Sequence, residues 1–253
     1  MLIDTHTHIY LPHFRKDAGS MMLRAKQAGV EKMILPNIDT GSIREMLYFT
    51  ASYPGRLHSM MGLHPGSVDE NYKTELDIIY EYLDSGGFVG IGEIGMDLYW
   101  DTTYRKQQED AFVTQCRWAA EKNLPVSIHS RDATAEVLDL LSKMKNPPRG
   151  IFHCFAGNIS QAMEVINIGF KIGVGGVVTF KNSKLPNVLE KIAPENLVLE
   201  TDAPYLAPHP NRGKRNEPAM LSFVANKLAE VYSLPVSEIE ARTSSSALQC
   251  FGL

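Results

Sequence analysis

Histidine and carboxylate side chains recur in this sequence at the ends of short apolar runs, a pattern typical of metal sites. His6 and His8 form an HxH pair after the first run, and alternation along an extended strand points both rings to one side. His64 and Glu93 end the third and fourth runs, and further metal-competent groups follow later runs: His129, His153 and Asp202. Burying such groups unpaired would be costly, and bound metal ions would remove that cost.

The ligand types favour zinc, manganese or iron-like ions over calcium, and they leave magnesium open. Six ligands are too many for one four-coordinate catalytic ion, but they suit two divalent ions about 4 Å apart. We predict that Glu93 bridges two ligand sets, namely His6, His8 and Asp202 on one ion and His129 and His153 on the other. Such a pair would activate a water and clamp phosphate oxygens, with Glu93 and Asp202 as catalytic residues and Asp202 as a proton acceptor.

A basic loop follows the last apolar run and places Arg212, Lys214 and Arg215 around Gly213. Arginine forks match phosphate oxygens, and a glycine lets the backbone approach a substrate closely. We therefore predict that these three cations bind phosphates of a substrate. The alternative is a solvated surface loop.

Two further residues are predicted to contact substrate. Arg131 follows His129 by two residues and is a second phosphate ligand, unless it forms a salt bridge at the rim. His64 is expected to bind substrate or to support the metal ligands. Tyr99 and Trp100 either stack on a base or sugar or pack their own loop.

Eight apolar runs rich in Val, Ile and Leu alternate with longer amphipathic stretches and must position these groups. Near-continuous apolarity is typical of parallel strands that are buried on both faces. The runs are Leu2–Thr5, Lys32–Pro36, Leu57–Gly62, Phe88–Gly92, Pro125–Ile128, Gly150–Phe152, Phe170–Val174 and Leu197–Thr201.

Eight strand–helix units in about 250 residues predict an α/β fold of the (β/α)8 TIM-barrel type, with one domain over residues 1–253. The carboxyl ends of all strands then form one face, where the metal-competent residues would meet. An open doubly wound sheet is the alternative. No glycine-rich nucleotide motif follows any run, which weakens the nucleotide-cofactor versions of that alternative.

The composition is that of an ordinary globular protein, with 44% hydrophobic and 21% charged residues, and it excludes a disordered tail protein. The net charge of −4 disfavours coating of a phosphate polymer by the surface as a whole. Three separated cysteines, no secretory signal and no apolar run near the roughly 20 residues of a membrane span lead us to expect a cytoplasmic protein without a membrane partner. No obligate protein partner is evident.

The motifs resemble those of the TatD-family metal-dependent deoxyribonucleases, within the amidohydrolase-like metallohydrolases. They occur in family order and read DTHTH, GLHP, GEIGMD, HSRDA, HCFAG, ETDAPYLAP and RGKRNEP, from Asp4 to Pro218. The resemblance implies a TIM barrel, divalent metal ions and hydrolysis of DNA phosphodiesters, often as a 3′→5′ exonuclease. It also supports Glu93, His129, His153 and Asp202 as ligands, because each falls on a matching motif position.

The sequence thus predicts a divalent-metal-dependent hydrolase of DNA that acts on strand ends, with single strands preferred to long duplex, through two Mg, Mn or Zn ions. The first alternative is an amidohydrolase or esterase that cleaves a small C–N or C–O bond with the same metals. The second is a barrel that binds metal only for structure. Phosphate recognition predicts that binding weakens as salt rises, whereas a small amide substrate predicts little salt dependence.

Overall fold

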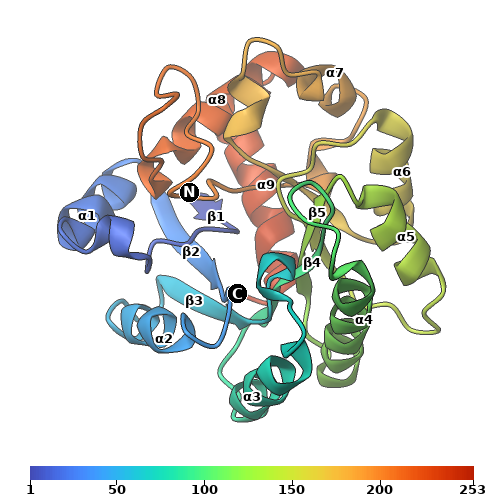
Figure 1. Ribbon diagram of the computed structural model, residues 1–253. Helices are drawn as coiled ribbons and strands as arrows, with labels where there is room; N and C mark the ends of the chain where they lie inside the picture. Colours follow the sequence, from blue (N-terminus) through green and yellow to red (C-terminus); the bar gives the residue numbers. More distant parts are fainter.

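The computed structural model describes residues 1–253, and its strands form a barrel with helices around the outside (Figure 1). Every neighbouring pair is parallel, and the strands follow one another in chain order from β1 to β8. They are β1 Leu2–Asp4, β2 Val30–Pro36, β3 Leu57–Met61, β4 Gly90–Asp97, β5 Val126–Arg131, β6 Gly150–Phe152, β7 Lys171–Val174 and β8 Leu197–Leu199.

The barrel closes where the end of β1 meets β8. Both the backbone N–H and the hydroxyl of Thr5 donate to the carbonyl of Leu199, at 2.9 and 3.0 Å. The predicted (β/α)8 barrel is therefore confirmed, and sequential strand order excludes the open doubly wound sheet.

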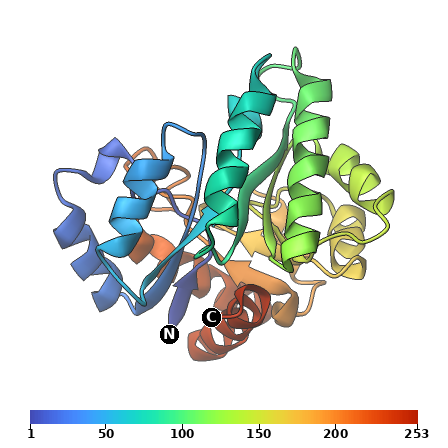
Figure 2. The ribbon, with the colours of Figure 1, turned by 90° about the horizontal axis from the view of Figure 1, so that it is seen from below.

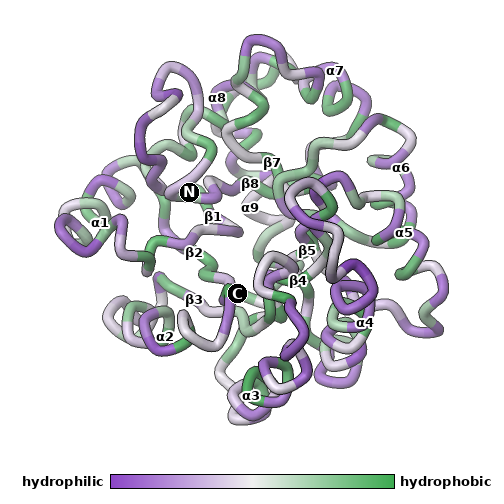
Figure 3. The backbone as a smooth tube through the Cα atoms, in the orientation of Figure 1, coloured by the Kyte–Doolittle hydropathy of each residue, from purple (hydrophilic) through white to green (hydrophobic).

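Helices cover the outer face of the barrel, and in Figure 3 they carry hydrophilic and hydrophobic stretches in alternation. None of them is both long and apolar enough to cross a bilayer. They are α1 Ala18–Gln27, α2 Ile43–Ala51, α3 Tyr72–Asp84, α4 Arg105–Lys122, α5 Thr134–Ser142, α6 Ile159–Asn167, α7 Leu185–Leu189, α8 Leu221–Tyr232 and α9 Val236–Phe251. Short 3₁₀ turns lie at Pro12–Phe14, Pro65–Ser67, Gly176–Thr179, Pro194–Asn196 and Pro218–Met220.

Apolar packing fills the space between strands and helices and also closes one end of the barrel. The larger core cluster holds 52 buried residues from the strands and the surrounding helices. In a second cluster, Ala247 and Phe251 of α9 pack against strand residues such as Ile3 and Met60. Figure 2 shows α9 lying across this end beside the amino terminus. The polar side chains of the barrel interior are thereby left for the opposite end.

Strand β4 is longer than the sequence indicated. The expected end at Gly92 is wrong, because the strand continues to Asp97 and pairs with β5 as far as Arg131. The pairing is irregular, because Ile91 pairs with Val126 and Ile94 pairs with Ile128. Strand β4 thus has one more residue than β5 between these two pairs. Such a bulge changes where a side chain points, and here it falls on the segment that carries Glu93.

The close approach of β4 and β5 requires a glycine at position 95. Gly95 has a φ of +139°, and a Cβ atom there would overlap the backbone carbonyl of His129. We predict that Gly95→Ala lowers the free energy of unfolding by about 2–4 kcal/mol, because either β5 must shift or the backbone must distort. Urea denaturation followed by circular dichroism measures the effect.

The matched control is Gly19→Ala in α1, where no atom lies within 4 Å of the added Cβ. This substitution should be neutral or stabilising by up to about 1 kcal/mol. Equal unfolding midpoints for the two variants would contradict the requirement at position 95.

Candidate metal centre

The carboxylate of Glu93 lies at the centre of the polar end of the barrel and is only 3% exposed. Its Oε2 atom lies 3.1 Å from Nε2 of His6 and 3.3 Å from Nε2 of His8, and these two nitrogens are 3.2 Å apart. Ligands held about 2.0–2.1 Å from a tetrahedral ion stand about 3.3 Å from one another. The three atoms therefore have the spacing that a divalent ion requires.

The tautomer of His8 strengthens this fit. The Tyr10 hydroxyl donates to the carbonyl of Pro36 at 2.7 Å, so it accepts from Nδ1–H of His8 at 3.2 Å. A neutral His8 ring then presents only a lone pair from Nε2 toward Glu93. Lone pairs that face one another in a buried site repel, and a cation between them removes the repulsion.

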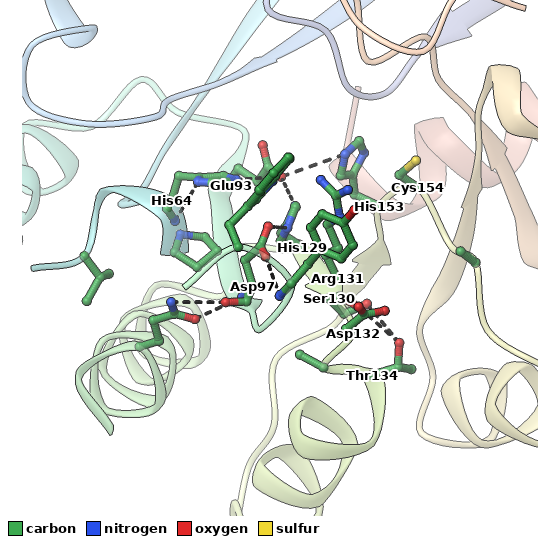
Figure 4. Close-up of a pocket in the computed structure, with 18 of the residues that line it drawn as sticks. His64, Glu93, Asp97, His129, Ser130, Arg131, Asp132, Thr134, His153 and Cys154 are labelled. Carbon is green, nitrogen blue, oxygen red and sulfur yellow. Dashed lines mark hydrogen bonds and ion pairs between the residues drawn. The ribbon is translucent and has the colours of Figure 1, made fainter. Parts of the chain in front are cut away.

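The other carboxylate oxygen, Oε1 of Glu93, faces a second set of imidazoles. It lies 2.9 Å from Nδ1 of His129, 3.5 Å from Nε2 of His64 and 3.8 Å from Nε2 of His153. Figure 4 shows these side chains converging on Glu93. The two oxygens thus serve different ligand sets, which is the arrangement expected of a carboxylate that bridges two ions.

Asp202 lies between the two ligand sets. Its Oδ1 atom is 3.7 Å from Nε2 of His8 and 3.9 Å from Nε2 of His153. The structure therefore brings all six predicted ligands together. Asp202 was expected to share an ion with His8, but it lies about as close to His153, which was expected on the other ion.

The outward-facing nitrogen of each of the four predicted histidine ligands lies close to a polar side chain that the sequence prediction missed. Such outer contacts fix the ring orientation and the tautomer of a metal-binding histidine. The partners are Ser127 for His6 at 2.9 Å, Tyr10 for His8 at 3.2 Å, Asp97 for His129 at 2.9 Å and Glu200 for His153 at 3.1 Å. Asp97 and Glu200 belong to the motifs GEIGMD and ETDAPYLAP. An acidic residue within these motifs was the sequence signal that could have identified them as partners of histidines.

His64 differs from the other imidazoles around Glu93. Its Nδ1 accepts a hydrogen bond from the backbone N–H of Gly66 at 2.9 Å, so a neutral ring carries its proton on Nε2. A protonated nitrogen donates hydrogen bonds and does not bind a metal ion. The geometry therefore favours His64 as a donor toward Glu93 or a substrate oxygen.

Burial and the surrounding charges shift the pKa values of the cluster in opposite directions. Burial lowers the pKa of His6 well below its usual range, helped by the neighbouring charge of His153, so the ring is neutral as a ligand must be. Burial alone would raise the pKa of Glu93, but the imidazoles around it hold that pKa well below its usual range. Burial raises the pKa of Asp202 to about 6, in the range useful for accepting a proton near neutral pH.

His129 and His153 are shifted upward. Burial would lower both pKa values, but Asp97 and Glu93 raise that of His129 to about 9, and Glu200 and Glu93 raise that of His153 to about 10. Carboxylates around these rings thus attract positive charge. Divalent ions that bind there compete with protons for the same nitrogens.

A buried carboxyl group joins the two chain segments that carry predicted ligands at opposite ends of the sequence. Asp4 on β1 accepts hydrogen bonds from the backbone N–H and the hydroxyl of Thr201, at 2.9 and 2.6 Å. Thr201 directly precedes Asp202, while Asp4 lies two residues before His6. This contact therefore sets the HxH pair beside Asp202.

The cluster opens into a cavity of about 1500 Å³ whose lining includes His64 and Arg131. Arg131 forms no salt bridge, so the alternative of an ion pair at the rim is not observed and its guanidinium is available to an anion. Its charged group lies 3.9 Å from the centre of the Tyr99 ring.

The basic loop lies outside this cavity. Arg215 donates to Asp17 at 2.7 and 2.8 Å and to the carbonyl of His13 at 2.7 Å, so a phosphate would have to displace these partners. Arg212 stacks on Phe180 at 3.6 Å in a separate hollow of about 540 Å³. Lys214 is exposed and lines neither space. None of the three predicted phosphate contacts therefore lines the cavity that contains Glu93.

Comparison with known proteins assigns this arrangement to a family. The family model described as TatD related DNase matches residues 3–252, almost the whole chain. The chain belongs to the TatD family. The resemblance seen in the motifs is thereby confirmed, and with it the description of a metal-dependent hydrolase.

Relatives of this TatD-family chain match it over nearly its full length. An uncharacterized metal-dependent hydrolase of Bacillus subtilis, YabD, is 36% identical over 253 residues, 99% of each chain. A Pectobacterium carotovorum protein named 3'-5' ssDNA/RNA exonuclease TatD is 29% identical and covers 100% of both. The crystal structure of the TatD homologue YjjV from Escherichia coli has a TM-score of 0.93 at 31% identity, covering 100% of this chain and 98% of that one.

We predict that Asp97→Asn lowers the affinity for divalent metal about 10- to 100-fold, because the amide no longer holds His129 as a charged acceptor. Isothermal titration of metal-free protein with Zn²⁺ or Mn²⁺ measures the change. Asp101→Asn is the matched control, because this exposed carboxylate lies four residues after Asp97 on the same loop and accepts hydrogen bonds from Thr103 instead of contacting a histidine. Unchanged affinity in Asp97→Asn would contradict the role assigned to this carboxylate.

Proposed function

We propose that the protein is a divalent-metal-dependent nuclease that hydrolyses DNA phosphodiester bonds and removes nucleotides from the 3′ end of a single strand. The observation that carries this proposal is the unpaired guanidinium of Arg131 at the mouth of the cavity whose floor is the Glu93 cluster. Metal-competent side chains around Glu93 and a cation that can bind an anion line the same cavity. This combination suits a phosphate ester as substrate. The name of the Pectobacterium relative supports the same activity and polarity.

Cavity size also supports a polymeric substrate. Pockets for small molecules typically occupy about 300–1,000 Å³. The cavity here measures about 1500 Å³ and leaves room for more than one nucleotide. A small amide or ester would fill only part of it.

Two divalent ions would be held by Glu93 together with two ligand sets. These sets would be His6, His8 and Asp202 on one side and His129 and His153 on the other. Bound divalent ions supply Lewis acidity at the phosphate oxygens and make water a better nucleophile at neutral pH.

The remaining steps belong to side chains of the chain itself. As water forms the new P–O bond and the P–O ester bond breaks, Asp202 accepts the proton of the water and returns it to the leaving oxygen. The Nε2–H of His64 donates to a phosphate oxygen. Arg131 holds a phosphate with its planar fork of donors. We assign Arg215 to holding its loop against Asp17. Arg212 and Lys214, which lie outside the cavity, are proposed to contact only phosphates farther along the strand.

The direct test is digestion of 5′-labelled single-stranded DNA with Mg²⁺, Mn²⁺ or Zn²⁺. We expect a ladder of products shortened from the 3′ end, no products in EDTA, and rates that fall as KCl rises.

Arg131→Ala should raise KM about tenfold, because one charge-assisted phosphate contact is lost. Arg117→Ala serves as control, since Arg117 is exposed on α4 and absent from the cavity lining.

The competing function is hydrolysis of a small amide or ester by the same ligands. It predicts turnover of such compounds without salt dependence and no shortening of DNA with any ion. That result would contradict the nuclease proposal.

A further inference from the structure

An exposed pair of aromatic side chains stands at the mouth of the cavity. Trp100 is 76% exposed, more than any other large hydrophobic side chain, and Tyr99 is 52% exposed. Their rings meet edge to face at 4.8 Å, and both side chains line the cavity. A role in packing their own loop would bury these rings, so their exposure favours contact with a ligand.

Arg131 completes this group of residues from the neighbouring strand. Its guanidinium lies 3.9 Å from the ring centre of Tyr99 and 5.1 Å from that of Trp100. Because the aromatic rings, and not a carboxylate, hold it in place, its positive charge stays available. Aromatic faces beside an uncompensated guanidinium match the two halves of a nucleotide, a flat base and a phosphate.

The position of these residues is tied to the metal-competent cluster through Asp97. One carboxylate oxygen of Asp97 accepts from the backbone N–H of Tyr99 at 3.0 Å, while the other contacts Nε2 of His129 at 2.9 Å. The backbone N–H of Leu98 also donates to the carbonyl of Arg131 at 3.0 Å. A ligand bound on the aromatic pair would therefore stand in a fixed relation to Glu93.

We propose that Tyr99, Trp100 and Arg131 form a nucleotide-binding shelf. An unpaired base next to the scissile phosphate stacks on Trp100, and the phosphate of that nucleotide binds Arg131. The proposal rests on the nuclease function given above and adds the residues that recognise the base. Stacking accepts any base, but it requires a free base face, so a paired base within a duplex is excluded.

The binding test uses the intrinsic fluorescence of Trp100. The chain has two tryptophans, and Trp118 lies on α4 against Tyr80, with ring centres 4.9 Å apart. The variant Trp118→Phe therefore leaves Trp100 as the only tryptophan. Titration of this variant with a short oligothymidylate in EDTA, where hydrolysis is blocked, should quench the emission. The same titration of Trp100→Phe, which keeps Trp118, should leave the emission unchanged.

The kinetic test pairs the protein variant with an altered substrate. Trp100→Ala should weaken kcat/KM on single-stranded DNA about tenfold to a hundredfold, the worth of one stacked base. The kcat/KM of the wild-type protein should fall by a similar factor on a strand that carries an abasic nucleotide next to the scissile bond. Trp100→Ala should lose little more on that abasic strand, because both changes remove the same contact. Tyr48→Ala, which alters a 73% exposed aromatic residue on α2, is the matched control and should match wild type.

The outcomes separate the shelf from the nuclease function. DNA hydrolysis without Trp100 quenching, and with equal abasic penalties in wild type and Trp100→Ala, would overturn the shelf and leave the nuclease intact. Quenching by the oligonucleotide without hydrolysis under any metal would support the shelf and overturn the nuclease.

Discussion

The contact on which the rest of this structure depends is that between one buried carboxylate and the imidazoles around it. Glu93 is 3% exposed, and its two oxygens face different histidines. An isolated charge in such a place would carry a large desolvation cost. Positive charge must therefore be present, either as protons on the rings or as metal ions. Tyr10 holds the proton of a neutral His8 on Nδ1, so that the lone pair of Nε2 faces Glu93. This arrangement favours a metal ion between them.

The barrel is the means by which residues far apart in the chain reach that carboxylate. Parallel strands in sequential order place every carboxyl end on one face, and α9 closes the other end with apolar side chains. Two local features refine the placement. The irregular pairing between Ile91 and Ile94 falls at Glu93. The hydrogen bonds between Asp4 and Thr201 join the segment that carries His6 and His8 to the segment that carries Asp202.

The sequence was sufficient to predict the barrel and the convergence of the six metal-competent side chains, because both follow from short-range signals. Apolar runs predict strands, and His or acidic residues at their ends predict a shared site. The sequence was insufficient to predict the side chains that contact the outward-facing nitrogens of the histidines. Ser127, for example, contacts His6 but lies 121 residues away in the sequence. The same holds for Arg215, whose partner Asp17 lies 198 residues away.

The length of β4 was missed for a different reason. Glycines such as Gly92 and Gly95 usually interrupt a strand, but here they allow the close approach of β4 to β5. The shelf residues Tyr99 and Trp100 remained undecided at the sequence level because aromatic residues pack loops as readily as they bind ligands. Their exposure, which the sequence does not give, is the observation that supports the proposed shelf.

The metal content of the purified protein, measured after equilibration with a divalent ion and removal of unbound metal, shows whether two ions share Glu93. The same measurement is made on Glu93→Gln. If Glu93 is shared by two ions, the wild-type protein holds two ions per chain and Glu93→Gln loses both, while Glu109→Gln, a partly buried carboxylate on α4 away from the cavity, keeps them. Circular dichroism should show that all three proteins are folded. Two ions retained by folded Glu93→Gln would contradict the account.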